Sequence, residues 1–424
     1  MKNGRAPWYY LVLLVLSGEM IFALPFVLPR VFRPTVLETF QLDNVQLGLC
    51  FSIYGIVALL SYLLGGPLAD KYAPRKLIAT ALFATGVGGF FLATFPSYSN
   101  LKLLYGYWGF TTIFLFWAPM IKATRIWGGQ ASQGKAFGFL EGGRGLVAAV
   151  LSSFVVLIFS FFLDSTTDSH TLAESRYAYG YSIRIISIFI LLVAIFVWQF
   201  MKSGTDSDDT SVVDKIRASQ IREVFKMKAV VLLMIIILCA YVGYKTTDML
   251  SLYANEVMNY NQVDSALVGT FLFYIRPATG IVFGIFADRW ITTRWLFISF
   301  VISLVGSIIF ATGFSALAGA FLFFMSIVVI AIGIYATRSL YFAVMQSGKI
   351  PLKYTGTAVG LVSLVGYTPD IFSGPMLGYL LDNNPGELGF QYVFWVMAGF
   401  SLVGAIAAYL YHREFGTGEY SAKR

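Results

Sequence analysis

The chain has 424 residues, of which 58% are hydrophobic and only 12% are charged, and its formal net charge is +8. Soluble domains carry about 25% charged residues, so this composition excludes an ordinary water-soluble enzyme. Cys50 and Cys239, the two cysteines, both lie in apolar runs, which excludes a disulfide scaffold. Because His170 and His412 lie apart in polar segments, the sequence predicts no metal centre and no cofactor.

Apolar segments long enough to cross a bilayer recur along the whole chain. A membrane helix needs about 20 predominantly apolar residues. Between polar and Pro/Gly-rich breaks we predict twelve such helices, over residues 8–31, 45–67, 77–95, 103–123, 136–163, 181–201, 229–257, 265–286, 295–314, 317–341, 356–380 and 390–411. The first is too long for a signal peptide and lacks a small-residue cleavage site. The predicted fold class is therefore an all-α membrane protein with twelve transmembrane helices.

The lysines and arginines of the connecting segments predict the orientation. Twenty of them fall on the side that holds both termini, and five fall on the other side. Cytoplasmic loops carry the excess of basic residues in membrane proteins. Both termini are therefore predicted to be cytoplasmic, in a multi-pass protein of the cytoplasmic (inner) membrane. The basic excess reflects topology, so we expect no nucleic-acid partner.

The longest polar break divides the predicted helices six and six. We predict an N-terminal six-helix bundle over 1–201, a cytoplasmic linker over 202–228 and a C-terminal six-helix bundle over 229–424. The first part of the linker is too polar to fold alone, whereas residues 213–225 are predicted to form a short amphipathic helix at the membrane surface. Nothing here is long enough for a catalytic domain, and no nucleophile–base pair is apparent, so we do not expect an enzyme.

Three short motifs of the first half recur in the second half in the same order. Gly66-Pro-Leu-Ala-Asp70-Lys71-Tyr72 recurs as Gly284-Ile-Phe-Ala-Asp288-Arg289-Trp290, Ala123-Thr-Arg125 as Ala336-Thr-Arg338, and Gly134-Lys-Ala-Phe-Gly138 as Gly356-Thr-Ala-Val-Gly360. Matches at corresponding places in both halves indicate a duplicated six-helix unit. Such repeats, rocking about a central site, form the architecture of many alternating-access carriers.

The Gly-x-x-x-Asp-[Arg/Lys] motif between the second and third helices resembles the loop signature of the major facilitator superfamily. Together with the twelve helices and the central loop, this resemblance covers the whole chain. Within the superfamily, further residues are similar to the organophosphate:phosphate antiporter branch: Asp70-Lys-Tyr-Ala-Pro74-Arg75, then Trp117, Pro119, Lys122, Trp127 and Gly134, and finally Asp248, Tyr253 and Glu256-Val257. The resemblance implies two pseudo-symmetric six-helix bundles and transport by alternating access.

The phosphate-binding residues of that branch are not matched. The branch holds phosphate with one arginine on the first helix and one on the seventh. Aligned without gaps, the first position is occupied by Glu19, and the second falls near Gly243, with Lys245 two residues later. A carboxylate where an anion should bind argues against a phosphorylated substrate.

Glu19 is predicted to lie near the bilayer midplane. It follows Trp8 by 11 residues, about 16 Å along a helix. An ionisable side chain at that depth is costly and normally faces a cavity or a partner. Because exclusion of water disfavours a charged carboxyl group, we predict that Glu19 binds substrate and carries the coupled proton. A structural pair with a basic residue of a neighbouring helix is the alternative.

The fifth predicted helix supplies Glu141 and Arg144, which share one helix face because they are three positions apart. Glycines surround them and would allow neighbouring helices to approach closely. A local ion pair that tightens packing is one interpretation. The other is substrate binding, for which Arg144, the deeper of the two, is the stronger candidate.

Arg276 and Asp370 complete the charged candidates for the substrate site. Arg276 lies about 18 Å from the cytoplasmic end of its helix, next to Pro277, and a proline frees backbone carbonyls that a cavity can use. Asp370 also follows a proline and is predicted to bind substrate or to close the outer gate. A tyrosine hydroxyl at mid-membrane needs a polar partner, so three tyrosines are predicted to line a polar cavity: Tyr54, Tyr274 and Tyr367.

A further set of charged residues is predicted to govern switching rather than substrate choice. Lys245 and Asp248, three positions apart, are expected to form a gate or packing pair. Near cytoplasmic helix ends, Arg125 and Arg338 are expected to extend to the membrane interface. The complete set of gating candidates is Asp70, Lys71, Arg75, Lys122, Arg125, Lys245, Asp248, Asp288, Arg289 and Arg338.

Together these features predict a secondary active transporter for a small polar solute. Mixed acidic and basic candidates favour a zwitterion or carboxylate, such as an amino acid, a short peptide or a sugar acid, and Glu19 favours proton symport. No P-loop is present, so ATP-driven transport is not expected. The expected partners are the substrate, protons and the lipid bilayer, and the expected state is a monomer. Alternatives are an exporter of drugs or metabolites including organophosphates, a non-transporting solute sensor, and a lipid flippase.

Overall fold

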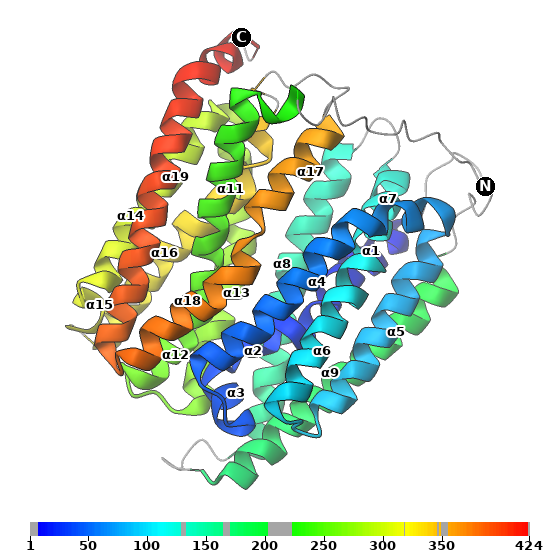
Figure 1. Ribbon diagram of the computed structural model, residues 1–424, viewed down its shortest axis with the longest axis vertical. Coiled ribbons are helices and arrows are strands. Elements are labelled where there is room, and N and C mark those ends of the chain that lie inside the picture. The colour runs from blue at the N-terminus through cyan, green and yellow to red at the C-terminus, as the bar shows by residue number, and fades with distance from the viewer. Residues whose placement is uncertain are drawn as a thin grey trace. The chain divides into compact units, whose positions relative to one another are not determined.

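The regular structure is helical throughout the residues that the computed structural model describes, namely 7–128, 133–163, 170–201, 223–317, 319–345, 347–348 and 355–422 (Figure 1). The predicted all-α membrane fold is confirmed. Most of the predicted amphipathic helix over 213–225, and with it residues 202–222 of the linker, lies outside the described residues.

The chain divides into two compact units. Unit 1 comprises Met1–Val213 together with Tyr260–Tyr274, and unit 2 comprises Asp214–Asn259 together with Ile275–Arg424. The division runs through one long helix, α13 (Gln262–Arg289), whose first half groups with unit 1. The predicted bundle boundaries at residues 201 and 229 stay predictions.

The helices of unit 1 begin at residues that suit a helix start. Asp43 forms a capping box with Gln46 in front of α4, Thr171 and Glu174 do the same for α9, and Pro74 opens α5. The elements are α1 (Trp8–Met20), the π-helix η1 (Ala23–Val27), α2 (Leu28–Val31), α3 (Arg33–Phe40), α4 (Asn44–Lys71), α5 (Pro74–Leu92), α6 (Tyr98–Gly109), the π-helix η2 (Phe110–Phe114), α7 (Trp117–Gly128), α8 (Gln133–Phe162) and α9 (Leu172–Phe200).

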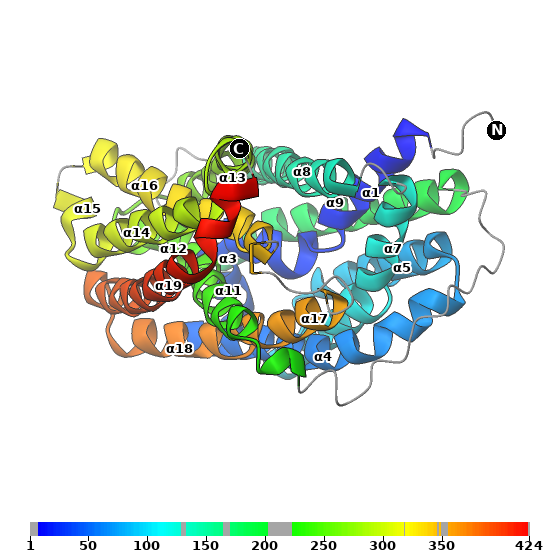
Figure 2. The ribbon, with the colours of Figure 1, turned by 90° about the horizontal axis from the view of Figure 1, so that it is seen from above.

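Unit 2 follows the same plan of long helices joined by short turns. Before the shared α13, its elements are α11 (Lys228–Thr246), the 3-10 helix η3 (Thr247–Met249) and α12 (Leu250–Glu256). After α13 follow α14 (Thr292–Ala311), α15 (Phe314–Leu317), α16 (Gly319–Leu340), the 3-10 helix η4 (Ala343–Met345), α17 (Thr355–Gly366), α18 (Pro369–Asn383) and α19 (Glu387–Ala422). Figure 1 shows α11 with α19 on one side and α17 on the other, and the view from above in Figure 2 shows the same order.

Nine helices of the described chain are long and apolar enough to cross a membrane, and the bent pair formed by α1 and residues 23–31 makes a tenth. The other two predicted spans, over 103–123 and 356–380, are each built from shorter pieces: α6, η2 and α7 for the first, α17 and α18 for the second. The count of twelve transmembrane helices stays a prediction.

Several predicted spans are broken where the sequence analysis expected continuous helices. The chain bends by 42° between α1 and the segment 23–31, where Pro25 cannot donate a backbone hydrogen bond and a π-turn forms. In unit 2, η3 interrupts the helix after Thr246, and Pro369 starts a new helix after α17. Breaks of this kind free backbone polar groups, and inside a membrane these groups need a protein partner or a polar cavity.

Glycines allow the helices around these breaks to pack closely. A Cβ atom added at Gly143 of α8 would lie 2.7 Å from Cγ1 of Val15 in α1, and one added at Gly306 of α14 would lie 2.6 Å from Cα of Ile330 in α16. A side chain at either position would force the two helices apart. The close approach of α1 and α8 is what brings the charged residues of unit 1 together.

Candidate functional site

Arg144 is the centre of a charged cluster in unit 1. Its Nε lies 3.3 Å from Oε2 of Glu19, and its Nη1 lies 2.7 Å from Oε1 of Glu141. Arg144 and Glu19 are buried, at 7% and 3% exposure, whereas the side chain of Glu141 is 54% exposed. One buried arginine is thus held between a buried carboxylate and an exposed one.

The break after α1 prepares this cluster. The Phe22 amide donates to the Glu19 carbonyl over 3.0 Å, and the Gly18 carbonyl accepts a 2.9 Å hydrogen bond from Nε of Arg144. A Cβ atom at Gly18 would lie 3.0 Å from Cδ of Arg144 and 3.2 Å from Sδ of Met120. Glycine at this position therefore lets the guanidinium reach the backbone of α1.

The pairing of Glu19 with Arg144 bears on the two interpretations of Glu19 in the sequence analysis. The structural alternative required a basic partner on a neighbouring helix, and Arg144 of α8 occupies that position. The guanidinium carbon of Arg144 also lies 5.6 Å from the centre of the Phe22 ring. An ion pair and a role in proton coupling are compatible, because a paired carboxylate can exchange its partner for a proton.

Unit 2 has its own buried ion pair. Nζ of Lys245 lies 3.1 Å from Oδ1 of Asp370, and 4.0 Å from Oδ2 of Asp248. The Tyr241 hydroxyl lies 3.1 Å from each carboxylate oxygen of Asp370, to which it donates. The spacing of three residues predicts a Lys245–Asp248 pair, but Asp370 is the nearer partner of Lys245.

Helix ends favour both charges of this pair. Lys245 lies in the last turn of α11, and Asp370 lies in the first turn of α18, directly after Pro369. A cation is stabilised at the carboxyl end of a helix and an anion at the amino end. The breaks that end α11 and start α18 therefore hold this ion pair in place.

Arg338 lies against tyrosine rings in unit 2. Its guanidinium carbon is 3.7 Å from the ring centre of Tyr244 and 5.7 Å from that of Tyr241. The Tyr241 ring in turn meets the Tyr367 ring edge-on, with centres 4.9 Å apart. Its position near a helix end predicts that Arg338 extends to the membrane interface, whereas the structure places its head group on aromatic faces.

The depth of Arg338 explains this difference. The chain does not leave the bundle after α16: the Tyr411 hydroxyl donates to the Val344 carbonyl over 2.9 Å, and a Cβ at Gly348 would lie 3.1 Å from Cβ of Ala229, at the start of α11. After Arg338 the chain therefore continues through a further turn that is packed against the bundle. The residue that it contacts, Tyr244, is about 24 Å along α11 from its first residue at ~1.5 Å per position.

The three remaining substrate candidates have different surroundings. The Tyr54 hydroxyl is buried and lies 2.6 Å from Oγ1 of Thr112 in the core of unit 1. The Tyr274 ring is 47% exposed, and its hydroxyl lies 2.8 Å from Oγ of Ser153. Arg276 is partly buried, next to Pro277 in α13. The contacts given above for Arg144 and Lys245 involve none of these three residues.

The gating candidates of unit 1 contact their own unit. Nζ of Lys122 donates to the Ala69 carbonyl over 2.8 Å, tying α7 to the end of α4. Nη1 of Arg75 donates to the Trp198 carbonyl over 3.3 Å. Lys71 and Arg125 are exposed. The side chains of Asp70, Asp288 and Arg289 lie outside the described residues.

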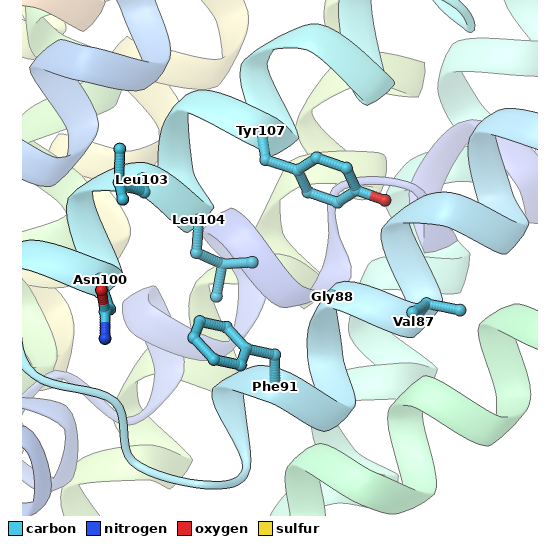
Figure 3. A pocket seen from close by; sticks show the side chains of 7 residues that line it. All are labelled: Val87, Gly88, Phe91, Asn100, Leu103, Leu104 and Tyr107. Atoms are coloured by element: carbon cyan, nitrogen blue, oxygen red, sulfur yellow. The ribbon is translucent and has the colours of Figure 1, made fainter.

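A shallow apolar groove of about 310 Å³ lies between α5 and α6 of unit 1 (Figure 3). It is lined by Val87, Gly88, Phe91, Asn100, Leu103, Leu104 and Tyr107. Figure 3 shows that no lysine, arginine, aspartate or glutamate side chain is among these residues. The groove therefore offers no recognition of a charged solute, and it is separate from both charged clusters.

Two contributors to the site were missed in the sequence analysis. Tyr241 and Tyr244 precede Lys245 on α11 at spacings of four and one, so Tyr241, Tyr244 and Lys245 lie within about one turn on adjoining positions of the helix. That spacing was a usable signal. Within the described residues, no group of three or more His, Cys, Asp or Glu side chains is placed to hold a metal ion.

Comparison with known proteins decides the family. Residues 15–373 match the model of the Major Facilitator Superfamily. The chain belongs to the Major Facilitator Superfamily. Two Escherichia coli K12 relatives are similar over nearly their full lengths: inner membrane protein YihN, 26% identical over 95% of each chain, and inner membrane protein YqcE, 25% identical over 96% of this chain and 95% of the relative.

Solved superfamily structures share the fold. A bacterial homologue of the human lysosomal transporter Spinster, in an inward-facing and occupied conformation, superposes with a TM-score of 0.71 at 18% identity, covering 96% of each chain. A point mutant of the nucleoside transporter NupG superposes with a TM-score of 0.74 at 15% identity, covering 95% of this chain and 99% of NupG.

Membership of the superfamily confirms the coarser predictions. The protein is a multi-pass membrane transporter of the inner membrane and not an enzyme, and it acts on a small-molecule substrate within a lipid bilayer. The charged clusters around Arg144 and Lys245 are the candidate sites for this activity, because buried ionisable groups in a membrane protein mark substrate and ion pathways.

Proposed function

We propose that this superfamily member is a proton-coupled symporter for a small zwitterion or carboxylate, which works by alternating access as a monomer. The observation that carries this proposal is the arrangement of Arg144 between Glu19 and Glu141. Two carboxylates within reach of one guanidinium give this cluster one negative charge in excess. A proton taken up by Glu19 removes that excess in a region where an unbalanced charge is costly.

Competition for Arg144 supplies the coupling. While Glu19 is ionised, it holds the Nε edge of the guanidinium together with the Gly18 carbonyl. Protonation weakens this ion pair and frees the guanidinium for an acceptor oxygen of the substrate. Proton binding and substrate binding then favour each other by the same free energy, as linkage requires.

The transport cycle follows from this competition. Glu19 takes up a proton, the guanidinium of Arg144 binds an acceptor oxygen of the substrate, the protein reorients, and proton and substrate leave on the cytoplasmic side. The gating candidates, with Arg75 and Lys122 as examples, set the rate of reorientation rather than the choice of substrate.

The organophosphate:phosphate antiporter branch remains the alternative assignment within the superfamily, and Glu19 argues against it. An acid at the position of a phosphate-binding arginine repels a dianionic phosphate ester. One structural neighbour is a nucleoside transporter, so nucleosides belong in a first ligand screen with amino acids, peptides, sugar acids and phosphate esters. Selective stabilisation of the protein by phosphate esters would overturn the assignment to zwitterions and carboxylates.

Proteoliposomes test the coupling once the screen has given a solute. Solute accumulation under an imposed inward proton gradient is compared with solute counterflow in the absence of a gradient. Glu19→Gln is expected to abolish accumulation and to retain counterflow, because it fixes the neutral form of the side chain. Glu414→Gln is the control, since this exposed residue pairs with Lys228 away from the cluster.

Each outcome has one meaning. Unchanged gradient-driven accumulation in Glu19→Gln removes Glu19 from proton coupling. Accumulation only under an outward proton gradient identifies an antiporter. Solute binding with neither counterflow nor accumulation in the wild-type protein identifies a non-transporting sensor.

A further inference from the structure

Arg338 differs in its surroundings from Arg144 and Lys245, the cations of the two charged clusters. Its Nη1 atom is buried and has no hydrogen-bond partner, and in the part of the chain that the structure describes no carboxylate forms a salt bridge with it. Arg144 and Lys245, in contrast, each have carboxylate partners. A positive charge inside a membrane protein without a carboxylate partner is costly, and such charges are kept where they have a function.

The tyrosine rings around Arg338 balance its charge only in part. Tyr244 and Tyr241 present their ring faces to the guanidinium at 3.7 and 5.7 Å, which is a favourable cation–π arrangement. A guanidinium also has five N–H donors in its plane, and ring faces do not accept from all of them. The Nη1 donors of Arg338 therefore need an acceptor that the tyrosine faces do not supply.

The nearby carboxylate is already engaged. Asp370 pairs with Lys245 at 3.1 Å and accepts from the Tyr241 hydroxyl. Asp248 lies 4.0 Å from the same lysine. Both carboxylates thus form salt bridges with Lys245, and neither forms one with Arg338.

The internal repeat gives an independent comparison. Arg125 occupies the position of Arg338 in the first half, within the repeated Ala-Thr-Arg motif. Arg125 is exposed, whereas Arg338 is partly enclosed with its Nη1 buried. The repeated arginine is therefore more enclosed in unit 2 than in unit 1, and it lies against aromatic rings that are not part of the motif.

We propose that Arg338 and the rings of Tyr241, Tyr244 and Tyr367 form a subsite for a sugar acid, with Arg338 binding the carboxylate and the tyrosines contacting the ring. The proposal rests on the proposed transport function and narrows its substrate class. The arginine fork matches a carboxylate in a bidentate arrangement, which supplies acceptors for the buried donors.

The same residues argue for a sugar acid over an amino acid. An amino acid brings an ammonium group that needs an acceptor carboxylate, and Asp370 already has Lys245 and Tyr241 as partners. A sugar ring brings C–H faces that pack on aromatic rings and hydroxyls that exchange hydrogen bonds with tyrosine hydroxyls. Because Tyr241 and Tyr367 meet edge-on, this small region presents aromatic rings in two orientations to a sugar.

Binding of three matched pyranoses to the full-length protein in detergent tests the proposal. D-glucuronate, D-glucose and D-glucosamine share a ring and carry a negative, a neutral and a positive group. Affinities are measured by titration with thermal stability as the readout, for the wild type, Arg338→Gln and Arg338→Lys. Arg294→Gln is the control, because Arg294 is an exposed arginine of the same unit in the first turns of α14.

The expected result is selective binding of D-glucuronate by the wild type and by Arg294→Gln. Arg338→Gln should weaken D-glucuronate binding about 10- to 100-fold, the loss of a charge-assisted hydrogen bond, and Arg338→Lys should fall between them. Without any sugar, Arg338→Gln should melt at the same or a higher temperature than the wild type, because it removes an unbalanced charge. A purely structural arginine would show the opposite change in melting temperature.

A second pair of variants tests the ring contact. Tyr244→Phe keeps the aromatic face and should retain most of the D-glucuronate affinity, whereas Tyr244→Leu should lose it. Equal binding of D-glucose and D-glucuronate by the wild type, no binding of D-glucuronate, or unchanged binding in Arg338→Gln would each overturn the subsite. These outcomes are independent of the proposed coupling. That coupling is tested by the transport of Glu19→Gln in proteoliposomes, with whichever solute the screen identifies.

Discussion

Lys245 and Asp370 join the end of α11 to the start of α18 across 3.1 Å. In unit 1, Glu19 and Arg144 join the end of α1 to α8 across 3.3 Å. Each pair links the first predicted helix of its half to the fifth, and the signs are exchanged: the acid is on the first helix in unit 1 and on the fifth in unit 2. The two halves therefore have an ion pair at corresponding places, with the positions of the acid and the base exchanged.

Removal of one partner from the unit 2 pair should destabilise the protein strongly. Asp370→Asn removes the nearer acid of Lys245, which is 3% exposed, and leaves Asp248 at 4.0 Å. A buried charge that loses its partner typically costs about 3–5 kcal/mol. The melting temperature of Asp370→Asn in detergent should therefore fall clearly below that of the wild type.

The double variant Lys245→Met/Asp370→Leu is the matched comparison. With both charges replaced by apolar side chains, stability should recover part of the loss, because neither Lys245 nor Asp370 leaves a charge behind, while Asp248 keeps its charge without this lysine at 4.0 Å. A double variant as unstable as Asp370→Asn would show that the pair is needed for packing rather than for charge balance.

The sequence was sufficient to predict the helical membrane fold and to locate most of the charged residues that form the two clusters, because both depend on composition and helix length. It was not sufficient for the partners. Depth along a helix placed Arg144 and Asp370 in the membrane, but it could not show that Asp370 rather than Asp248 is the nearer partner of Lys245. That choice depends on helix breaks, which a hydropathy pattern averages out.

Arg338 shows the same limit from the other direction. Its distance from the predicted helix end indicated an interfacial residue, and the packed turn through Val344 makes that distance misleading. Only the tertiary contact of this turn with Tyr411 shows that the packed chain continues past the arginine. Sequence position therefore ranks buried charges reliably only where the helix ends themselves are known.

Gly18 should be sensitive to a single added methyl group. In Gly18→Ala the new Cβ would lie 3.0 Å from Cδ and 3.3 Å from Nε of Arg144, so the Arg144 side chain must shift by a few tenths of an ångström where it contacts the Gly18 carbonyl and Glu19. Because the proposed coupling depends on that contact, gradient-driven accumulation should fall while the protein remains folded. Transport in proteoliposomes and the melting temperature are measured together.

Gly142→Ala is the control for this variant. A Cβ at Gly142 meets nothing within 4 Å, and alanine favours a helix over glycine by about 1 kcal/mol. Gly142→Ala should therefore be as stable as the wild type or more stable, with accumulation unchanged. Equal losses of accumulation in the two variants would contradict a specific role for the Gly18 contact.

Stability should also depend on pH through Glu38, which lies on α3 outside the membrane-spanning segments. Burial raises the pKa of Glu38 above its usual value of 4.5, against the lowering effects of Ser175, His170 and Gln262. A raised pKa means that the folded state binds more protons than the unfolded state. The contribution of Glu38 to stability is thus fully present below pH 4.5 and is lost as the pH rises through the raised pKa.

Glu38→Gln should flatten this part of the pH profile. The neutral amide avoids the cost of burying a carboxylate, so the variant should gain stability relative to the wild type as the pH rises toward neutrality. Melting temperatures from acidic to neutral pH give the comparison. A constant difference between the two proteins across that range would exclude Glu38 as the titrating group.

The two carboxylates that flank Arg144 should contribute unequally to stability. Glu141 is 54% exposed, and exposed ion pairs contribute about 0–1 kcal/mol, so Glu141→Gln should change the melting temperature little. Glu19 is buried, and Glu19→Gln removes the acidic partner that lies inside the protein with Arg144. Its cost should be the larger of the two, because a buried ion pair that loses one partner typically costs about 3–5 kcal/mol, although Arg144 keeps Glu141. Thermal unfolding of the two variants side by side decides the order, and a larger loss in Glu141→Gln would identify the exposed carboxylate as the one that holds Arg144.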